Sequence, residues 1–182
     1  MRLCVRPLDV KSTLKIDGRS IEWQGNVGEM RRFVVPEGVL MAMPRVVRFQ
    51  DIDAAGILFY PRALEYFHDA YLAHLDNQGI DLPRVLREGA WGAPIVRVEA
   101  DFKAPMRFGD EIIVLVEGAD VGRSSLGVRY RVRASNDASR VYCSGKTVHV
   151  FIDPATQKPR EIPDDVRAAF TSKEAPAPPP RM

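Results

Sequence analysis

The stretch from Pro61 to about Gln78 constrains the fold of this chain most, because it has the pattern of one long amphipathic helix. Its apolar residues recur at intervals of three and four, which places them on one broad helical face. Pro61 suits the first helical position, where a missing N–H costs nothing, and Gly79 suits the position just past the helix end. The apolar face is predicted to comprise Ala63, Leu64, Tyr66, Phe67, Ala70, Tyr71 and Leu75.

Segments with the alternating pattern of β-strands lie on both sides of this helix. Turn signals rich in glycine, serine, asparagine and aspartate separate several of them. Shorter helices are expected at residues 81–88 and 164–170. Strands are predicted at residues 46–50, 94–102, 111–117, 127–134 and 141–152. This periodicity by itself predicts an α+β protein.

The chain of 182 residues has the length of one domain but changes in composition along its course. Residues 1–43 read as an N-terminal extension, to which we assign no chemistry. A natural start at Met41 or Met43 is one interpretation, and a small added hairpin, indicated by the Asp-Gly signal at 17–18, is the other. The sequence leaves both open. The domain is expected at residues 44–171, and the proline-rich tail at 172–182 is expected to be disordered.

Charge, cysteine content and hydropathy exclude several classes of protein. A formal net charge of +2 is too small to suggest a nucleic-acid partner. Cys4 and Cys143 lie too far apart for a disulfide framework, and Cys143 is expected to be a buried free thiol. No apolar run approaches the length of a membrane span, and the N-terminus lacks a secretory apolar region. We therefore predict a cytoplasmic protein, and no metal-ligand spacing is present in the sequence.

The loop before the long helix carries the residues best suited to chemistry. Asp51 and Asp53 follow a predicted strand, and Gly56 lets the next turn approach a ligand because it has no Cβ. The N–H of Tyr60, just ahead of Pro61, is free at the positive end of the helix dipole. A carboxylate facing a free amide can attack a carbonyl, or activate water against it, while the amide holds the carbonyl oxygen. Acyl transfer is therefore the predicted chemistry, although most Asp-x-Asp loops only cap backbone amides.

This loop has the form F-x-D-x-D-x-x-G-x-x-x-[YF], which resembles the 4-hydroxybenzoyl-CoA thioesterase family of acyl-CoA hydrolases. The likeness continues through GAPIVRVEADFKAPMRFGDEI (92–112) and GRSSLGVRYRV (122–132). It ends in VHVFIDPATQKPREIP (148–163), which is similar to the bacterial branch associated with the Tol-Pal system. The resemblance covers roughly residues 45–170 and implies the hotdog fold, in which an antiparallel sheet wraps around one long helix.

The resemblance also implies a role for each residue of the loop. Asp53 aligns with the family's essential carboxylate, which acts as a nucleophile or as a base that delivers water. Asp51 matches a position that is usually structural, and we expect it to accept backbone N–H bonds. The backbone N–H of Tyr60 would polarise the thioester carbonyl, and Gly56 would allow the close approach. Family members often have histidine near this step, so the Phe-Tyr-Pro sequence here predicts a more aromatic pocket.

Residues on the helix and on one strand are expected to bind the acyl group. His68 lies on the apolar helix stripe, where a satisfied core histidine is the more frequent interpretation; in the family, however, this position borders the acyl pocket. Pro94 and Ile95 begin the strand that, by the same resemblance, contributes to a site shared between subunits. His149 has no partner pattern and is interpreted as facing one side of the last strand.

A polar turn at Arg123, Ser124 and Ser125 is the expected contact for coenzyme A. In family members, basic residues near this turn meet the phosphates, and guanidinium groups bind phosphate well. For a single arginine, a solvated hairpin is the simpler interpretation. Neither serine stands in a G-x-S-x-G elbow, so we do not expect a serine nucleophile.

The leading hypothesis is an acyl-CoA thioesterase that converts a short-chain or aromatic acyl-CoA to the free acid and coenzyme A, without a metal or redox cofactor. One alternative is release of an acyl chain from an acyl carrier protein. Another is a non-hydrolytic acyl-CoA-binding or scaffold protein at the cell envelope. A single hotdog unit leaves a sheet edge open, and the strand at 94–102 is expected to pair with its copy. We therefore expect a homodimer or a homotetramer.

Overall fold

The computed structural model describes residues 20–24 and 30–171, and the chain divides into two compact units, Met1–Glu37 and Gly38–Met182. In the first unit, strands β1 (Ser20–Gln24) and β2 (Met30–Val34) pair antiparallel. The hairpin turn expected at residues 17–18 and the proline-rich tail lie outside the described residues.

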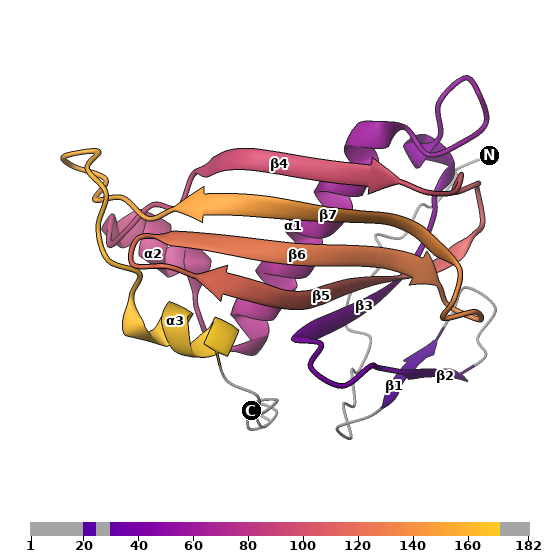
Figure 1. The fold of residues 1–182 in the computed structure, drawn as a ribbon, viewed down its shortest axis with the longest axis horizontal. Coiled ribbons are helices and arrows are strands. Elements are labelled where there is room, and N and C mark those ends of the chain that lie inside the picture. Colours follow the sequence, from indigo (N-terminus) through magenta and orange to yellow (C-terminus); the bar gives the residue numbers. More distant parts are fainter. Residues whose placement is uncertain (1–19, 25–29, 172–182) are drawn as a thin grey trace, which may run out of the picture. The chain divides into compact units, whose positions relative to one another are not determined.

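In the second unit, five antiparallel strands form one sheet, and the long helix α1 (Tyr60–Asn77) lies against one face of it (Figure 1). The strand order is β3-β5-β6-β7-β4. The bounds are β3 (Met41–Val46), β4 (Ile95–Phe102), β5 (Glu111–Val121), β6 (Ser125–Ala134) and β7 (Val141–Val150). Two shorter helices, α2 (Leu82–Glu88) and α3 (Asp164–Thr171), complete the unit. One long helix wrapped by an antiparallel sheet is the hotdog arrangement, so the predicted fold is confirmed.

Helix α1 packs against the centre of the sheet through the predicted apolar face, of which only Leu64 is not fully buried. Phe67 stacks on Tyr130 of β6, with ring centroids 4.8 Å apart. A Cβ at Gly145 of β7 would collide with the Phe67 ring and with the Glu99 carbonyl. The helix can therefore approach β7 closely only because this position has no side chain.

The first strand of the sheet lies earlier in the chain than predicted. β3 ends at Val46, and Phe49–Asp51 forms a short 3-10 helix, so the strand predicted at residues 46–50 is wrong. Pro44 stands inside β3, and proline is tolerated there because β3 is an edge strand of the sheet. The sheet therefore begins at Met41, ahead of residue 44, where we expected the domain to start.

Strand β5 is longer than predicted because a glycine forms a bulge within it. The pairing of β5 with β6 shifts register between Val116 and Gly118 and then continues to Val121. Gly118 has a φ of 154°, which closes the bulge without a side chain.

Within the described residues, no helix combines the length and the apolar character that a membrane span requires.

Candidate active site

The loop between β3 and α1 is held in place by Asp51, whose side chain is buried at the first turn of the loop. Its Oδ2 accepts hydrogen bonds from the Tyr66 hydroxyl at 2.7 Å and from the Arg48 backbone N–H at 3.1 Å. The Arg48 and Arg62 guanidinium groups also lie within 4 Å of the carboxylate, at 3.5 and 3.8 Å. Burial alone would raise the pKa of Asp51, but the hydrogen bonds from Tyr66 and Arg48 outweigh it and lower the pKa. Asp51 thus has the contacts of a structural anchor.

Asp53 lies half-buried at the tight turn that follows, with part of its carboxylate unused. Its Oδ1 accepts from the Ala55 N–H at 2.8 Å, and its backbone carbonyl accepts from the Gly56 N–H at 3.0 Å. Gly56 has a φ of 75°, which is the conformation its position was expected to need. Within the described part of the chain, Asp53 Oδ2 makes no hydrogen bond. This oxygen is therefore available to a substrate or to water.

The backbone N–H of Tyr60 is the candidate oxyanion donor. Tyr60 is the first residue of α1, where N–H groups have no acceptor inside the helix. The preceding N–H, of Phe59, is already used, because it donates to the Asp51 carbonyl at 2.8 Å. The side chains of Phe59 and Tyr60 are exposed and meet edge to face, with ring centroids 5.4 Å apart. The helix start thus offers a free amide beside an aromatic surface.

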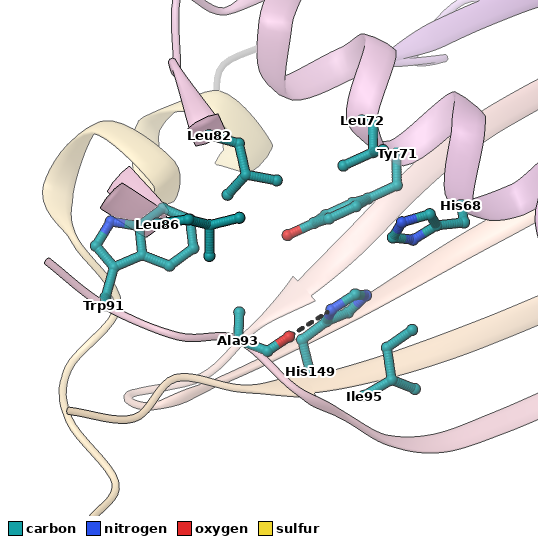
Figure 2. A pocket seen from close by; sticks show the side chains of 9 residues that line it. All are labelled: His68, Tyr71, Leu72, Leu82, Leu86, Trp91, Ala93, Ile95 and His149. Carbon is teal, nitrogen blue, oxygen red and sulfur yellow. Dashed lines mark hydrogen bonds between the residues drawn. The ribbon is translucent and has the colours of Figure 1, made fainter. Parts of the chain in front are cut away.

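A pocket of about 140 Å³ opens beside the middle of α1, between α2 and the beginning of β4 (Figure 2). Its wall is mostly apolar and aromatic. His68 is exposed and lines this pocket, so it is not the buried core residue that a histidine on an apolar stripe most often is. Ile95 lines the pocket, whereas Pro94 does not. The lining residues are His68, Tyr71, Leu72, Leu82, Leu86, Trp91, Ala93, Ile95 and His149.

His149 lines the pocket, although the sequence analysis assigned it no role in binding. Its Nδ1 lies 3.3 Å from the Ala93 carbonyl, and its Nε2 lies 3.0 Å from the Thr147 hydroxyl (Figure 2 shows the first contact). Since a carbonyl only accepts, Nδ1 carries the proton and Nε2 accepts from Thr147, whose oxygen accepts in turn from Tyr130 at 3.0 Å. Burial lowers the pKa of His149. One signal in the sequence could have identified His149. Polar residues occur at two alternate positions, 147 and 149, on the helix-facing side of the strand.

The Arg123 turn lies far from the Asp53 loop, at the same end of the sheet as the pocket but outside its lining. Figure 1 shows the β5–β6 turn and the first turn of α1 at opposite ends of the sheet. Arg123 is exposed and pairs with Glu161 at 2.8 Å. Ser124 and Ser125 use their backbone carbonyls to accept from the N–H groups of Phe151 and Gly122. None of the three lines the pocket, and neither does Asp53, so one chain does not bring all the predicted site residues together.

Strand β4 borders the pocket and has an unusual surface for the edge of a sheet. Val98 pairs with Thr147, and Phe102 pairs with Cys143, both of which face the helix side and are buried. Val98 and Phe102 therefore face the same side, yet they are 43% and 49% exposed. The opposite edge of β4 has no partner strand among the described residues. This row of exposed apolar side chains needs a covering partner.

The charged residues of the site do not form a metal centre. Among residues 20–24 and 30–171, no group of three or more histidine, cysteine, aspartate or glutamate side chains is placed to hold a metal ion.

Comparison with known proteins gives a consistent set of relatives. The model of the thioesterase-like superfamily matches residues 47–170. A 1,4-dihydroxy-2-naphthoyl-CoA hydrolase of Rippkaea orientalis is 32% identical over 130 residues, which cover 71% of this chain and 94% of the relative. A protein of the same name from Nostoc punctiforme is 32% identical over 67% of this chain and 80% of the relative.

Solved structures agree with this set. A gentisyl-coenzyme A thioesterase has a TM-score of 0.61 and 28% identity, over 72% of this chain and 99% of its own. The 1,4-dihydroxy-2-naphthoyl-CoA thioesterase of Synechocystis has a TM-score of 0.68 at 23% identity, over 71% of this chain and 94% of its own, and this likeness concerns the fold. The stretch that the superfamily model matches contains the Asp53 loop, α1 and four of the five strands of the sheet.

Proposed function

Because this chain belongs to the thioesterase-like superfamily, we propose that it hydrolyses thioesters of coenzyme A with aromatic acids, yielding the free acid and coenzyme A. The observation that carries this proposal is the Asp53 loop. One carboxylate oxygen of Asp53 and the N–H of Tyr60 belong to the same short segment, and neither makes a hydrogen bond within the described part of the chain. The relatives named for 1,4-dihydroxy-2-naphthoyl-CoA and gentisyl-CoA support an aromatic acyl group. The aromatic wall of the pocket supports it independently.

Asp53 has two chemical routes to the product. In the first, its carboxylate bonds to the thioester carbonyl carbon, the C–S bond breaks and coenzyme A leaves as a thiolate; water then hydrolyses the resulting anhydride. In the second, the carboxylate takes a proton from water, whose oxygen attacks the same carbon; the C–S bond breaks, coenzyme A leaves as a thiolate, and the proton on Asp53 passes to the thiolate. In both routes the carbonyl oxygen gains negative charge, which the Tyr60 N–H and the helix dipole stabilise. Asp51 is unsuited to either role because its carboxylate is buried and anchored by Tyr66 and Arg48.

The complete site is proposed to form between two copies of the chain. β4 begins at Ile95 in the pocket, and its far end lies toward the Asp53 loop, since Leu58 of that loop donates to the Met106 carbonyl just past β4. If two β4 strands pair antiparallel around a two-fold axis, the loop of one copy comes beside the pocket of the other. The same pairing would cover the exposed Val98 and Phe102 side chains. A tetramer built from two such dimers remains a prediction.

Several finer assignments also remain predictions. Coenzyme A is the proposed thiol, and release from an acyl carrier protein is the alternative. A place near the 4-hydroxybenzoyl-CoA thioesterase family and its Tol-Pal-associated branch rests on the sequence motifs. A cytoplasmic location is likewise a proposal. A non-hydrolytic scaffold role is disfavoured, because Asp53 and the free helix start are both present.

The experiment that tests this function is thiol release from a panel of acyl-CoAs, followed with a thiol-reactive reporter. The panel contains benzoyl-, hydroxybenzoyl-, 1,4-dihydroxy-2-naphthoyl-, acetyl-, hexanoyl- and palmitoyl-CoA, each with a matching pantetheine thioester. We expect the aromatic thioesters to have the highest kcat/KM. A preference for palmitoyl-CoA would overturn the aromatic assignment, and no thiol release from any member would overturn the proposed function.

A further inference from the structure

Three tyrosine hydroxyl groups lie in the core between α1 and the sheet, and one of them lacks a partner. The Tyr66 hydroxyl donates to Asp51 at 2.7 Å, and the Tyr130 hydroxyl bonds to Thr147 at 3.0 Å. Tyr71 is also buried, at 4% exposed, compared with 1% for Tyr66 and for Tyr130. Its hydroxyl makes no hydrogen bond to any residue that the structure describes. Although the Tyr71 ring is buried, its hydroxyl oxygen is not a buried atom and is accessible from the pocket, where a ligand can reach it.

The unpartnered hydroxyl points into the pocket. Figure 2 shows the Tyr71 oxygen directed away from α1, toward the space between Leu82, Leu86 and Ala93. Packing fixes this direction, because the Tyr71 ring stacks on His149 with centroids 4.6 Å apart and lies 5.9 Å from the Phe170 ring. Burial also raises the pKa of Tyr71 above its usual value, so the hydroxyl keeps its proton and can donate or accept.

The surroundings of this hydroxyl do not suit a trapped water. A buried water needs about two to four polar partners. The wall facing the hydroxyl is made of leucine and alanine side chains, and both ring nitrogens of His149 are already engaged by Ala93 and Thr147. His68, on the side of the pocket nearer the start of α1, is the other polar side chain with capacity to spare. The Tyr71 hydroxyl is therefore available to hydrogen-bond a polar group of a ligand that fills the pocket.

The size and walls of the pocket indicate what that ligand is. The volume of about 140 Å³ is close to the roughly 150 Å³ of an engineered apolar cavity in another protein that binds one benzene molecule. The flat rings of Tyr71, Trp91 and His149 suit a planar group. We propose that Tyr71 is a specificity-determining residue, whose hydroxyl hydrogen-bonds a polar substituent on a single aromatic ring of the acyl group. This inference rests on the proposed function, since it concerns the acyl group of the same substrate.

The test compares ring-hydroxylated and plain substrates in three proteins. The ratio of kcat/KM for 2-, 3- and 4-hydroxybenzoyl-CoA to that for benzoyl-CoA is measured in the wild type, Tyr71→Phe and Tyr66→Phe. Because each ratio compares two substrates of the same protein, a loss of activity that affects both substrates equally leaves the ratio unchanged. We expect the wild type to prefer at least one hydroxybenzoyl isomer by about tenfold, the scale of one hydrogen bond to a buried group. Tyr71→Phe should lower that ratio to about one, whereas Tyr66→Phe, which removes a buried hydroxyl of the same helix away from the pocket, should leave it unchanged.

Each outcome decides the inference separately from the function. A wild-type ratio of about one for all three isomers overturns it, as does a preference that survives in Tyr71→Phe, while hydrolysis of benzoyl-CoA still upholds the proposed function. If no acyl-CoA is hydrolysed, calorimetric titration with free hydroxybenzoates and benzoate applies the same comparison to binding. In that titration, an affinity for hydroxybenzoate that is equal in the wild type and in Tyr71→Phe would overturn the inference. Phenylalanine keeps both ring contacts of Tyr71, so thermal unfolding should show that the variant folds.

Discussion

At the scale of single residues, two aspartates one position apart differ because their oxygen atoms have different partners. Asp51 is buried and accepts from Tyr66 and Arg48, so its carboxylate is part of the scaffold. One carboxylate oxygen of Asp53 accepts a hydrogen bond within the turn, and the other makes no hydrogen bond to any described residue.

Asp53→Asn is predicted to fold normally and to lose acyl-CoA hydrolysis by several orders of magnitude, because the amide is neither a nucleophile nor a base. Its Oδ1 can still accept from the Ala55 N–H, so the turn is kept. Asp51→Asn is the matched control: it should lower the free energy of unfolding by about 2 kcal/mol, through weaker bonds to Tyr66 and Arg48. Thiol-release assays and urea denaturation check both. A stable, inactive Asp51→Asn together with an active Asp53→Asn would reverse the two roles.

Arg123→Ala is predicted to raise KM for acyl-CoA and to leave KM for the matching pantetheine thioester unchanged, if the turn contacts the nucleotide phosphates. Arg123 is ion-paired with Glu161, so Glu161→Gln should free the guanidinium and lower KM for acyl-CoA. Added salt should weaken the effect of both changes, because exposed charges are screened. Equal changes with both substrates would show that the turn does not contact the nucleotide.

At the scale of elements, the fit between α1 and β7 depends on one glycine. Gly145→Ala places a methyl group against the Phe67 ring and the Glu99 backbone, neither of which can move without shifting the helix or the sheet. We expect a loss of about 1–3 kcal/mol in the free energy of unfolding, as for other overpacked cores. The control is Gly127→Ala, whose Cβ meets chiefly the flexible end of Lys146. Urea denaturation of both variants should separate them, and equal losses would contradict the close packing of α1 on β7.

At the scale of the whole molecule, the exposed apolar side of β4 predicts a dimer that is needed for activity. Val98→Asp puts a charge on the row that a second copy would bury, so it should give monomers and abolish hydrolysis. Asp101→Lys changes the charge on the opposite face of the same strand, and it should leave the dimer intact. Light scattering coupled to chromatography, with activity measured on each fraction, tests the prediction. An active wild-type monomer at micromolar concentration would rule out the shared site.

Stability of the whole molecule is predicted to fall as the pH drops below about 6.5. Burial lowers the pKa of His74 and of His149 below the usual 6.5, so the folded chain keeps both neutral while the unfolded chain binds protons. The contribution of these two histidines to the free energy of unfolding is therefore complete above pH 6.5. It is lost as the pH falls toward their pKa values in the folded chain. Denaturation at pH 7.5 and pH 5.5, at one protein concentration, checks this. His68→Gln, at an exposed position, should keep the difference; equal stability of the wild type at both pH values would contradict it.

Local signals in the sequence were sufficient for the helices and for the geometry of the loop. The period of α1, its start beside Pro61 and its end before Gly79, with a φ of 77°, depend on residues within a few positions of each other. The positive φ of Gly56, 75°, is likewise a local feature, because it belongs to a single turn. The first strand was misplaced because residues 46–50 alternate like a strand, whereas β3 contains Pro44, and only the sheet order shows that this proline stands on an edge.

The pocket was decided only by the tertiary structure. Tyr71, Trp91 and His149 come from α1, from the segment before β4 and from β7, and no local pattern reports that they share one cavity. Whether a buried hydroxyl or imidazole is satisfied depends on partners distant in sequence: Thr147 for Tyr130, Ala93 for His149, and none within the described residues for Tyr71. The sequence by itself thus determined the elements, because backbone geometry is set by near neighbours. Packing determined the binding surface, because burial and hydrogen bonding between distant segments exist only once the chain is folded.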